Sequence, residues 1–383
     1  MWTRVLAETL RSDEKSVLLL GPRQVGKSTL MASLGPDLVL NLARESLFLE
    51  LASNPGALEE RLVARPETRV TVFIDEVQRL PSVLNTVQAL LDESPRRYRF
   101  LLTGSSARKL RRGNANLLPG RIHVYALGAV VAREASYKLP TRLALSVGTL
   151  PGVLGHPREE TRRKTLTSYA ATYLREEVQA EALTREIEGF ARFMTAAGDW
   201  SGRFLDVSKL AQAAQASRKS VARWIEVLED TLLVRRVDSF AKSATRRLVQ
   251  HPKLFFFDVG VWNGLLCNFE VSADRIGALF EHLVCQQLFD SASAIDATLR
   301  VSTFRTEHGA EVDFIVELGR KVWAIELKAS SHAASSDLSG LRRFADYFGK
   351  AHQARLWYLG SERRRIGGVD VLPWQEGLRE LGL

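Results

Sequence analysis

The N-terminal part of the chain alternates short apolar runs with segments of helical character. Buried strands of a parallel sheet read as continuous apolar runs, and helices connect them. This pattern predicts an α/β domain built around a parallel sheet. The expected strands are Ser16–Leu20, Leu38–Leu42, Val70–Ile74, Phe100–Thr103 and Ile122–Ala126.

The middle of the chain changes to helical patterns. Residues Glu160–Glu188 are rich in charge and contain neither glycine nor proline, which predicts a helical connector or lid. Asp206–Gln215 predicts a short helix, and Ser217 is the expected N-cap of a second helix over Arg218–Thr231. The second helix should bury a stripe at i, i+3, i+4 and i+7. That stripe is Val221, Trp224, Ile225 and Leu228, and it leaves Arg218, Lys219 and Arg223 as candidate DNA contacts.

With Leu232–Arg236 as a wing strand, these two helices have the pattern of a winged helix-turn-helix. Modules of this kind contact DNA, but they also serve as docking surfaces for proteins. Both alternatives are open from the sequence.

The last part of the chain mixes strand and helix patterns again and predicts a third module. Gly319-Arg320 fits a two-residue hairpin turn. Pairing Leu318 with Lys321 puts Asp313 opposite Glu326, and Glu311 opposite Lys328, on one face of the hairpin. The expected core face is apolar: Val312, Phe314, Val316, Trp323, Ile325 and Leu327.

Length and composition fit this division. The 383 residues are enough for two or three domains, and we expect them at 1–175, 176–250 and 251–383. No apolar run approaches the ~18 residues that span a bilayer, and no secretory signal is evident, so we expect a cytoplasmic protein without a membrane partner. The only two cysteines, Cys267 and Cys285, cannot form a zinc site or a disulfide framework.

The net charge of +9 favours a polyanionic partner, although a basic surface by itself often serves solubility. One stretch, from Ser94 to His123, carries eight basic residues and no acidic one. It would hold the phosphates of a nucleotide or of a nucleic acid. These residues are Arg96, Arg97, Arg99, Arg108, Lys109, Arg111, Arg112 and Arg121.

Residues 21–28 fit the pattern G-x-x-x-x-G-K-[ST], between an expected strand and an expected helix. Glycines let backbone N–H groups wrap phosphates, Lys27 would contact the β- and γ-phosphates, and Ser28 would bind Mg²⁺. The sequence therefore predicts an ATP and Mg²⁺ site. Its expected nucleotide-binding residues are Gly21, Pro22, Arg23, Gln24, Val25, Gly26, Lys27, Ser28 and Thr29.

The strand Val70–Ile74 ends in two carboxylates that complete this site. Asp75 would hold the hydrated metal ion, and Glu76 would polarise the attacking water. Thr103 ends the next strand and could sense the γ-phosphate, or simply terminate the strand. Arg121 is a candidate for an arginine that reaches a γ-phosphate, in its own molecule or a neighbouring one, with an ordinary surface arginine as the alternative.

In the third module, like charges that face each other across a strand pair destabilise it, and a divalent cation would remove that penalty. Asp313, Glu326 and Lys328 therefore read as a metal-assisted phosphodiester site. The alternative is a solvated face with a Glu311–Lys328 salt bridge. Glu281 lies in a helix where it borders an apolar stripe and could reach the same metal ion.

Taken together, these motifs resemble prokaryotic AAA-type ATPases that join a P-loop domain to a C-terminal domain with a restriction-endonuclease-like core. The resemblance rests on GPRQVGKST, VFIDEVQRLP, LLTGSSARKL, LPGR, SYAATYLREEV, HPKLFFFDVGVWNGLL, GALFEHLV, EVDFIV and AIELK, and covers nearly the whole chain. It implies an oligomerising ATPase, as a ring or dimer, and assigns Glu281, Asp313, Glu326 and Lys328 to the nuclease motif. Val312 stands where the motif's formal name has proline.

We therefore expect an α/β P-loop ATPase that acts in DNA processing by translocation or remodelling, with branched or unpaired DNA among its candidate substrates. The alternative is a regulatory nucleotide switch of the signalling kind, whose C-terminal module only binds. A DNA motor should hydrolyse ATP faster when DNA is present, whereas a switch should hydrolyse slowly and ignore it.

Overall fold

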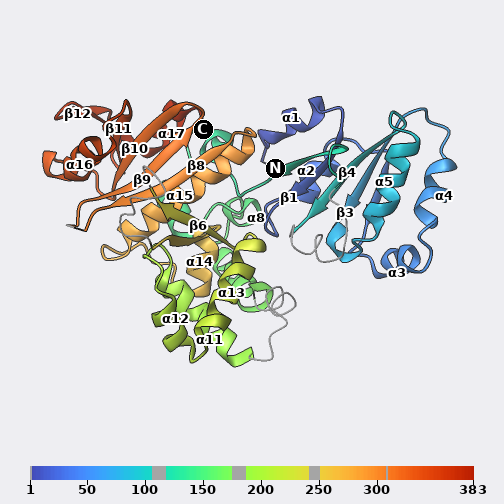
Figure 1. Cartoon of the computed structure of the whole chain (residues 1–383), viewed down its shortest axis with the longest axis horizontal. Coiled ribbons are helices and arrows are strands. Elements are labelled where there is room, and N and C mark those ends of the chain that lie inside the picture. The colour runs from blue at the N-terminus through green and yellow to red at the C-terminus, as the bar shows by residue number, and fades with distance from the viewer. Residues whose placement is uncertain (1, 106–117, 175–186, 241–250, 308) are drawn as a thin grey trace. The chain divides into compact units, whose positions relative to one another are not determined.

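The computed structural model of the chain describes residues 2–105, 118–174, 187–240, 251–307 and 309–383 (Figure 1). The chain folds into two compact units. The N-terminal unit comprises Met1–Ala129 with the short segments Asp230–Leu232 and Ser293–Asp296, and the C-terminal unit comprises Val130–Glu229, Leu233–Ala292 and Ala297–Leu383. Within the described ranges, no helix combines the length and the apolar character needed to cross a membrane.

The N-terminal unit contains a parallel sheet of five strands among its described residues, in the order β2-β3-β4-β1-β5. All five strands occur where the apolar runs predict them, so the expected α/β fold of this part is confirmed. Asp75 ends β3 and Thr103 is the last residue but one of the neighbouring β4, and the loop before Lys27 follows β1, which pairs with β4 at Thr103. The strands are β1 (Ser16–Leu20), β2 (Leu38–Asn41), β3 (Val70–Asp75), β4 (Tyr98–Gly104) and β5 (Ile122–Ala126).

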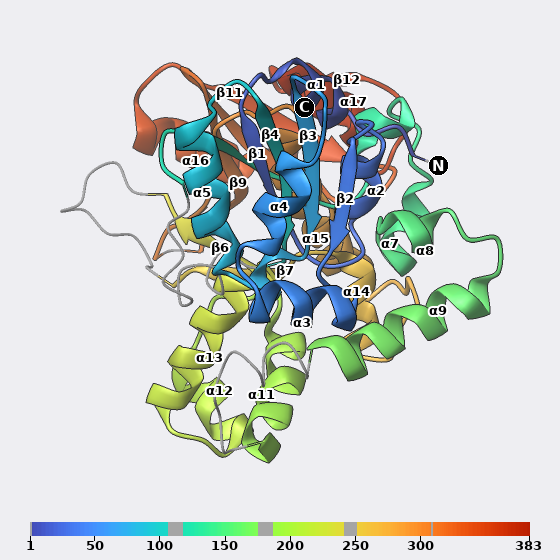
Figure 2. The ribbon, with the colours of Figure 1, turned by 90° about the vertical axis from the view of Figure 1, so that its right-hand side faces the viewer.

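Helices cover the sheet because successive strand residues point to opposite faces. Leu18 and Leu20 of β1 belong to a core that also includes Leu58 and Val87 from helices on one side. Figure 2 shows α4 and α5 in front of the strands. The helical segments of this unit are α1 (Leu6–Ser12), α2 (Lys27–Ala32), α3 (Glu45–Ser53), α4 (Ala57–Val63), η1 (Val77–Arg79) and α5 (Val83–Glu93).

The C-terminal unit begins earlier than we predicted. Residues 130–174, which we assigned to the first domain, pack within this unit. One reason is Asn263, whose Nδ2 donates hydrogen bonds to the carbonyls of Leu145 (3.0 Å) and Ser146 (2.8 Å). The boundaries expected near residues 175 and 250 lie outside the described ranges, as do residues 175–186 of the expected connector. The segments involved are η2 (Ala132–Ala135), α7 (Thr141–Val147), α8 (Pro151–Leu154), α9 (Glu159–Ser168), η3 (Tyr169–Leu174) and α14 (Val259–Leu265).

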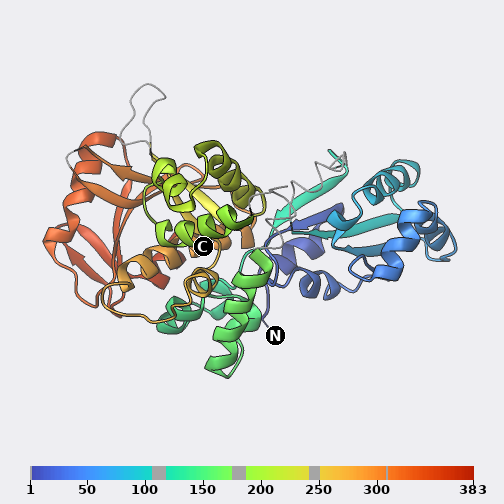
Figure 3. The ribbon, with the colours of Figure 1, turned by 90° about the horizontal axis from the view of Figure 1, so that it is seen from below.

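Three helices, α11 (Ile187–Trp200), α12 (Val207–Ala214) and α13 (Arg218–Asp230), form a group within this unit (Figure 3). Asp206 caps α12 by accepting from the N–H groups of Ser208 (3.0 Å) and Lys209 (3.1 Å). Ser217 caps α13, because its Oγ accepts from the N–H of Ser220 at 3.0 Å. The predicted stripe Val221, Trp224, Ile225 and Leu228 is buried.

The rest of the C-terminal unit is built on a sheet of eight strands, counted over the described residues, in the order β12-β13-β11-β10-β9-β8-β6-β7. Helix α16 packs on one face through Phe344, which lies 5.4 Å from Phe240 and 5.2 Å from Phe304 between ring centroids. The elements are β6 (Val234–Ser239), β7 (Lys253–Phe256), α15 (Ile276–Ala294), β8 (Leu299–Arg305), β9 (Glu311–Leu318), β10 (Lys321–Lys328), η4 (Ser335–Leu338), α16 (Ser339–Phe348), β11 (Gln353–Tyr358), β12 (Arg364–Ile366), β13 (Val369–Pro373) and α17 (Trp374–Leu381).

The hairpin β9–β10 has the predicted turn, with Leu318 paired to Lys321, but its faces differ from our prediction. The face that we expected to be polar is also buried in part. Its residues Ile315 and Ala324 belong to a hydrophobic cluster that includes residues of α16. Phe314 points the other way and lies 6.2 Å from Phe255 between ring centroids. The sheet is therefore covered on both sides, so a solvated polar face is wrong for this hairpin.

Candidate nucleotide site and carboxylate cluster

The loop between β1 and α2 has the conformation that the glycines of the motif allow. Gly26 has φ 93° and Gln24 has φ 65°, both in the left-handed region. At Gly21 a Cβ would lie 2.2 Å from the carbonyl oxygen of Leu127, so only glycine fits this close approach. The loop therefore has a fixed shape before the helix begins at Lys27.

Lys27 is 5% exposed, and its Nζ donates to the carbonyl oxygens of Gly21 and Pro22, each at 2.8 Å. A buried ammonium needs such acceptors, because burial without them costs several kcal/mol. The cation is therefore held inside the loop whose backbone N–H groups would receive phosphates. Its placement agrees with the role that the motif predicts.

Asp75 at the end of β3 accepts hydrogen bonds from side chains of two other elements, α2 and β4. Ser28 of α2 donates its Oγ hydrogen to Asp75 Oδ1 at 2.9 Å, and the Thr103 hydroxyl of β4 donates to the same oxygen. The Thr103 oxygen in turn accepts from the N–H of Glu76 at 3.1 Å. A hydroxyl beside a carboxylate is the donor set that P-loop sites offer to Mg²⁺, so these residues fit a Mg²⁺–nucleotide complex.

Glu76 follows β3 in the left-handed region, with φ 61°. This turn leads into the short helix η1, where Gln78 points back to the site. Gln78 Nε2 donates to Glu76 Oε2 and to Ser105 Oγ, the latter at 3.2 Å. The sequence did not single out Gln78, because only the turn at Glu76 brings it beside the carboxylate.

Arg121 lies away from the nucleotide loop of its own unit. It precedes β5, whose first residue pairs with Ser16, at the amino end of β1. The loop leaves the other end of that strand, roughly 16 Å along five residues. Arg121 contacts Asp92 instead, with Nε–Oδ1 2.5 Å and Nη2–Oδ2 2.9 Å. A role toward the γ-phosphate of the same molecule is therefore wrong, and only the alternative of a neighbouring molecule stays a prediction.

A second group of titratable residues lies in the C-terminal unit, and we call Glu281, Glu311, Asp313 and Glu326 the carboxylate cluster. They come from α15, β9 and β10. Lys253 of β7 joins them: its Nζ lies 2.8 Å from Glu281 Oε1 and 3.0 Å from Glu311 Oε1. The nuclease motif residues Glu281, Asp313 and Glu326 lie close enough for their charges to act on one another, together with a lysine that we did not predict.

Two contacts differ from the predicted register of the hairpin. The regular pairing of β9 with β10 ends at Phe314 and Ile325, so Asp313 and Glu326 are not a ladder pair. Asp313 Oδ2 instead accepts from the N–H of Leu327 at 2.8 Å. The predicted alternative of a Glu311–Lys328 salt bridge is also wrong, since Glu311 contacts Lys253. Lys328 Nζ lies 2.6 Å from Asp337 Oδ1.

Burial and mutual repulsion shift the acidity of the carboxylate cluster. Burial, followed by the charge of Glu281, raises the pKa of Asp313. Burial, followed by the charge of Asp313, raises the pKa of Glu326. Burial lowers the pKa of Lys253, but the charges of Glu281 and Glu311 outweigh it and raise that pKa overall. The Lys253 ammonium therefore stays charged, and Asp313 and Glu326 keep their protons to a higher pH than isolated carboxyl groups do.

The candidate DNA contacts Arg218, Lys219 and Arg223 are exposed on α13, opposite its buried stripe. Four residues of the basic stretch lie outside the described ranges. They are Arg108, Lys109, Arg111 and Arg112.

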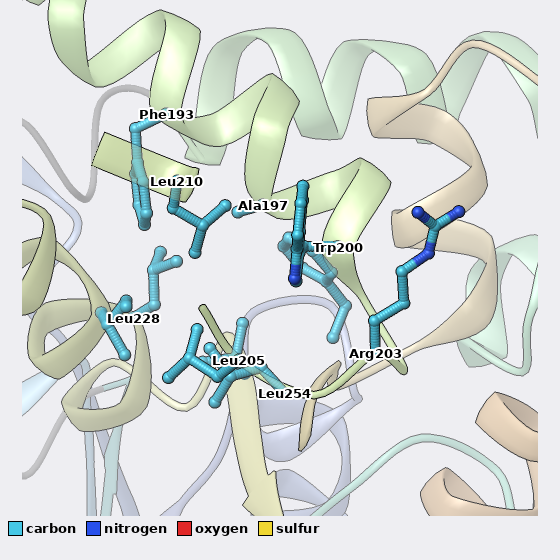
Figure 4. Close-up of a pocket in the computed structure, with 11 residues that line it drawn as sticks. Phe193, Ala197, Trp200, Arg203, Leu205, Leu210, Leu228 and Leu254 are labelled. Carbon is cyan, nitrogen blue, oxygen red and sulfur yellow. The ribbon is translucent and has the colours of Figure 1, made fainter. Parts of the chain in front are cut away.

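A cavity beside these helices is part of their packing. It has a volume of about 10 Å³ and a mostly apolar lining that includes Phe193, Leu210 and Leu228 (Figure 4). A cavity of this size holds about one water molecule. It is too small to bind an organic ligand.

The parallel sheet, the phosphate loop and the paired Ser28 and Asp75 together define a P-loop nucleotide-binding domain. The match to known families agrees: residues 13–136 match the AAA domain family AAA_14, so the N-terminal part is an AAA-type P-loop ATPase domain. Residues 141–272 and 276–376 match two domains of unknown function, DUF8612 and DUF4143.

Two relatives are similar over most of the chain. An uncharacterised protein of Mycobacterium bovis and one of Mycobacterium tuberculosis are each 27% identical over 322 residues, which cover 82% of this chain and 70% of theirs. Neither description assigns a function.

Among solved structures, PCH-2 of C. elegans has 16% identity and a TM-score of 0.29, over 59% of this chain and 66% of that one. A DNA polymerase III gamma subunit-related protein of Thermotoga maritima has 12% identity and a TM-score of 0.26, over 74% and 85%. A signal transduction ATPase of Pyrococcus horikoshii has 13% identity and a TM-score of 0.26, over 75% and 46%. TM-scores this low carry no conclusion about this chain.

Proposed function

We propose that this protein is a Mg²⁺-dependent ATPase that binds DNA and uses ATP hydrolysis to process it, by translocation or remodelling. The observation that carries the ATPase part is the convergence of Lys27, Ser28, Asp75, Glu76 and Thr103 at the carboxyl end of one parallel sheet. The candidate DNA substrates include branched and unpaired forms.

Each residue at this site has a separate task in the proposed reaction. Lys27 contacts the β- and γ-phosphates, and Ser28 and Asp75 hold Mg²⁺, which neutralises developing charge on the phosphates when it is bound. Glu76 polarises the attacking water. Thr103 orients Asp75 and Glu76 together, because its hydroxyl bonds to both. This is electrostatic stabilisation by groups that are already in place.

The proposed DNA contact rests on α12 and α13, which we interpret as the two helices of a winged helix-turn-helix. The strands β6 and β7 pair antiparallel after α13, as a wing would. The exposed Arg218, Lys219 and Arg223 lie at and near the start of the second helix, where such modules contact DNA. Each phosphate contact should make binding weaker as salt rises.

We interpret the remaining strands of the C-terminal unit, with the carboxylate cluster, as a restriction-endonuclease-like module that contacts DNA beside the winged helix. The predicted boundaries near residues 175 and 250, between the lid or connector, the winged helix and the endonuclease-like module, remain part of this proposal, with residues 130–174 in the C-terminal unit. We further propose that the protein assembles into a ring or dimer. In such an assembly Arg121 would leave Asp92 and reach the nucleotide of a neighbouring molecule.

The deciding experiment measures ATP turnover by the full chain without DNA and with single-stranded, duplex and junction DNA at several salt concentrations. A DNA-processing ATPase should turn over several-fold faster with at least one of these DNA forms. Slow turnover that no DNA form changes would favour the signalling switch.

A pair of variants separates nucleotide binding from hydrolysis. Lys27→Ala should lose ATP binding, because the lysine contacts the phosphates of the ground state. Glu76→Gln should keep binding and lose turnover, because the carboxylate acts on water in the transition state. Equal loss of ATP affinity in both variants, measured by fluorescent nucleotide titration, would contradict this assignment of roles.

A further inference from the structure

The carboxylate cluster contains a cation that belongs to the chain itself. Lys253 is 4% exposed, and its ammonium lies within 3.0 Å of one oxygen each from Glu281 and Glu311. The charge of Asp313 also acts on it. One lysine therefore contacts two of the four carboxylates and feels the charge of a third.

The backbone of the chain fixes this lysine on both sides. In β7, Lys253 pairs with Val237 of β6, and on its other side it forms a bridge with Phe204. The Phe204 ring lies 5.0 Å from the ammonium, a cation–π distance. Two carboxylates and an aromatic ring therefore hold the buried ammonium in place, so it is a fixed part of the cluster.

A divalent metal ion does not fit the cluster in this arrangement. Mg²⁺ requires several carboxylate and water oxygens in octahedral geometry. Glu281 and Glu311 already face an ammonium, and Asp313 uses one oxygen for the Leu327 N–H. Over the described residues, no three acidic, histidine or cysteine side chains are placed to hold a metal ion. A second cation would also be repelled by the buried Lys253.

The lysine of the nuclease motif is engaged elsewhere as well. Lys328 Nζ lies 2.6 Å from Asp337, which holds η4 by accepting from the N–H of Ala334 at 2.9 Å. Each of the two lysines is thus paired with a carboxylate of the chain. Metal-assisted cleavage requires carboxylate oxygens that can bind the metal ion and a lysine beside them. Here Lys253 occupies two of the carboxylates, and Lys328 contacts Asp337 instead.

We propose that Lys253 is the resident cation of the carboxylate cluster, in the place where a restriction-endonuclease-like site would hold a divalent metal ion. The C-terminal unit then contacts DNA without cleaving it. The DNA contact rests on the function proposed above, whereas the resident cation stands on the geometry of the cluster alone.

The test is a calorimetric titration of the full chain with MnCl₂, without nucleotide, next to the Asp313→Asn variant. Mn²⁺ that binds outside the cluster binds equally to both proteins, so the difference between them reports on the cluster. We expect no difference. Binding to the wild-type chain that Asp313→Asn removes would overturn the proposal.

A gain-of-binding variant gives the converse result. Lys253→Met keeps most of the apolar stem and removes the charge, so it should bind Mn²⁺ at least tenfold more tightly than the wild-type chain, and adding Asp313→Asn should abolish the gain. A folded Lys253→Met protein with unchanged Mn²⁺ affinity would refute a resident cation. Circular dichroism establishes folding, and if this variant does not fold, the comparison of wild type with Asp313→Asn decides the matter.

The outcome is separable from the ATPase proposal. Incubation of the wild-type chain with the same DNA panel and Mn²⁺ should give no cleavage products, while DNA-stimulated ATP turnover is measured in parallel. Cleavage that Asp313→Asn abolishes would overturn the resident cation and leave the ATPase proposal intact.

Discussion

Thr103→Val tests whether the nucleotide site depends on one buried hydroxyl. Thr103 is fully buried, donates to Asp75, and accepts from the N–H of Glu76 at 3.1 Å. Valine has nearly the same shape, so the substitution removes two hydrogen bonds and creates little space. Losing a bond to a charged group costs about 1.5–3 kcal/mol, and a buried N–H left unpaired costs about 1–3 kcal/mol.

Part of this cost should raise the activation free energy of ATP hydrolysis, because both lost hydrogen bonds orient groups that act on the γ-phosphate or on water. If about 1.4–2.8 kcal/mol reaches the transition state, kcat for ATP hydrolysis falls about ten- to hundredfold. Nucleotide affinity should change much less, since Lys27 and the loop backbone are untouched. The melting temperature should also fall, because the hydroxyl supports the folded state.

The assay is steady-state ATP turnover with a coupled enzyme system, together with fluorescent nucleotide titration for affinity. Thr71→Val is the matched control, since Thr71 lies near the other end of β3 from Asp75. The control should keep kcat within about twofold of wild type. A Thr103→Val protein with wild-type kcat, or one whose loss is entirely in nucleotide affinity, would refute the orienting role of this hydroxyl.

Three further outcomes are expected. Lys219→Glu and Arg223→Glu should each weaken DNA binding in low salt by fluorescence anisotropy; if both bind like the wild type, α13 is a protein-docking helix instead. Gln78→Ala should alter kcat more than ATP affinity, because Gln78 contacts the Glu76 carboxylate; an unchanged kcat would make that contact purely structural. Burial lowers the pKa of His282 to about 4, below its unfolded value near 6.5. The folded state therefore binds this proton less readily than the unfolded state, and the free energy of unfolding should fall as pH drops from about 6.5 to 4. The fall should be up to about 1.4 kcal/mol per pH unit larger than in His282→Gln. Equal pH dependence of the two proteins in denaturant titrations would contradict this.

The sequence was sufficient for the features that depend on neighbouring residues. The apolar runs predicted all five strands of the N-terminal sheet, because buried parallel strands need continuous apolar residues. The glycine spacing predicted the phosphate loop, whose φ values only a few residue types adopt. The helical spacing of Trp224 and its neighbours predicted the buried stripe of α13, and Asp206 and Ser217 predicted the starts of two helices.

The tertiary structure decided the features that depend on segments far apart in the chain. Lys253 reads in the sequence as one charge in an apolar strand, which signals that it needs a partner but not which one. Its partners Glu281 and Glu311 come from a helix and a strand that only the fold brings to β7. Arg121 has a motif that suits a phosphate, but pairing of β5 with β1 puts it at the far end of the sheet. Hydrophobic periodicity reports which face of an element is buried and carries no information on which element covers it, so contacts of this kind follow only from the packed chain.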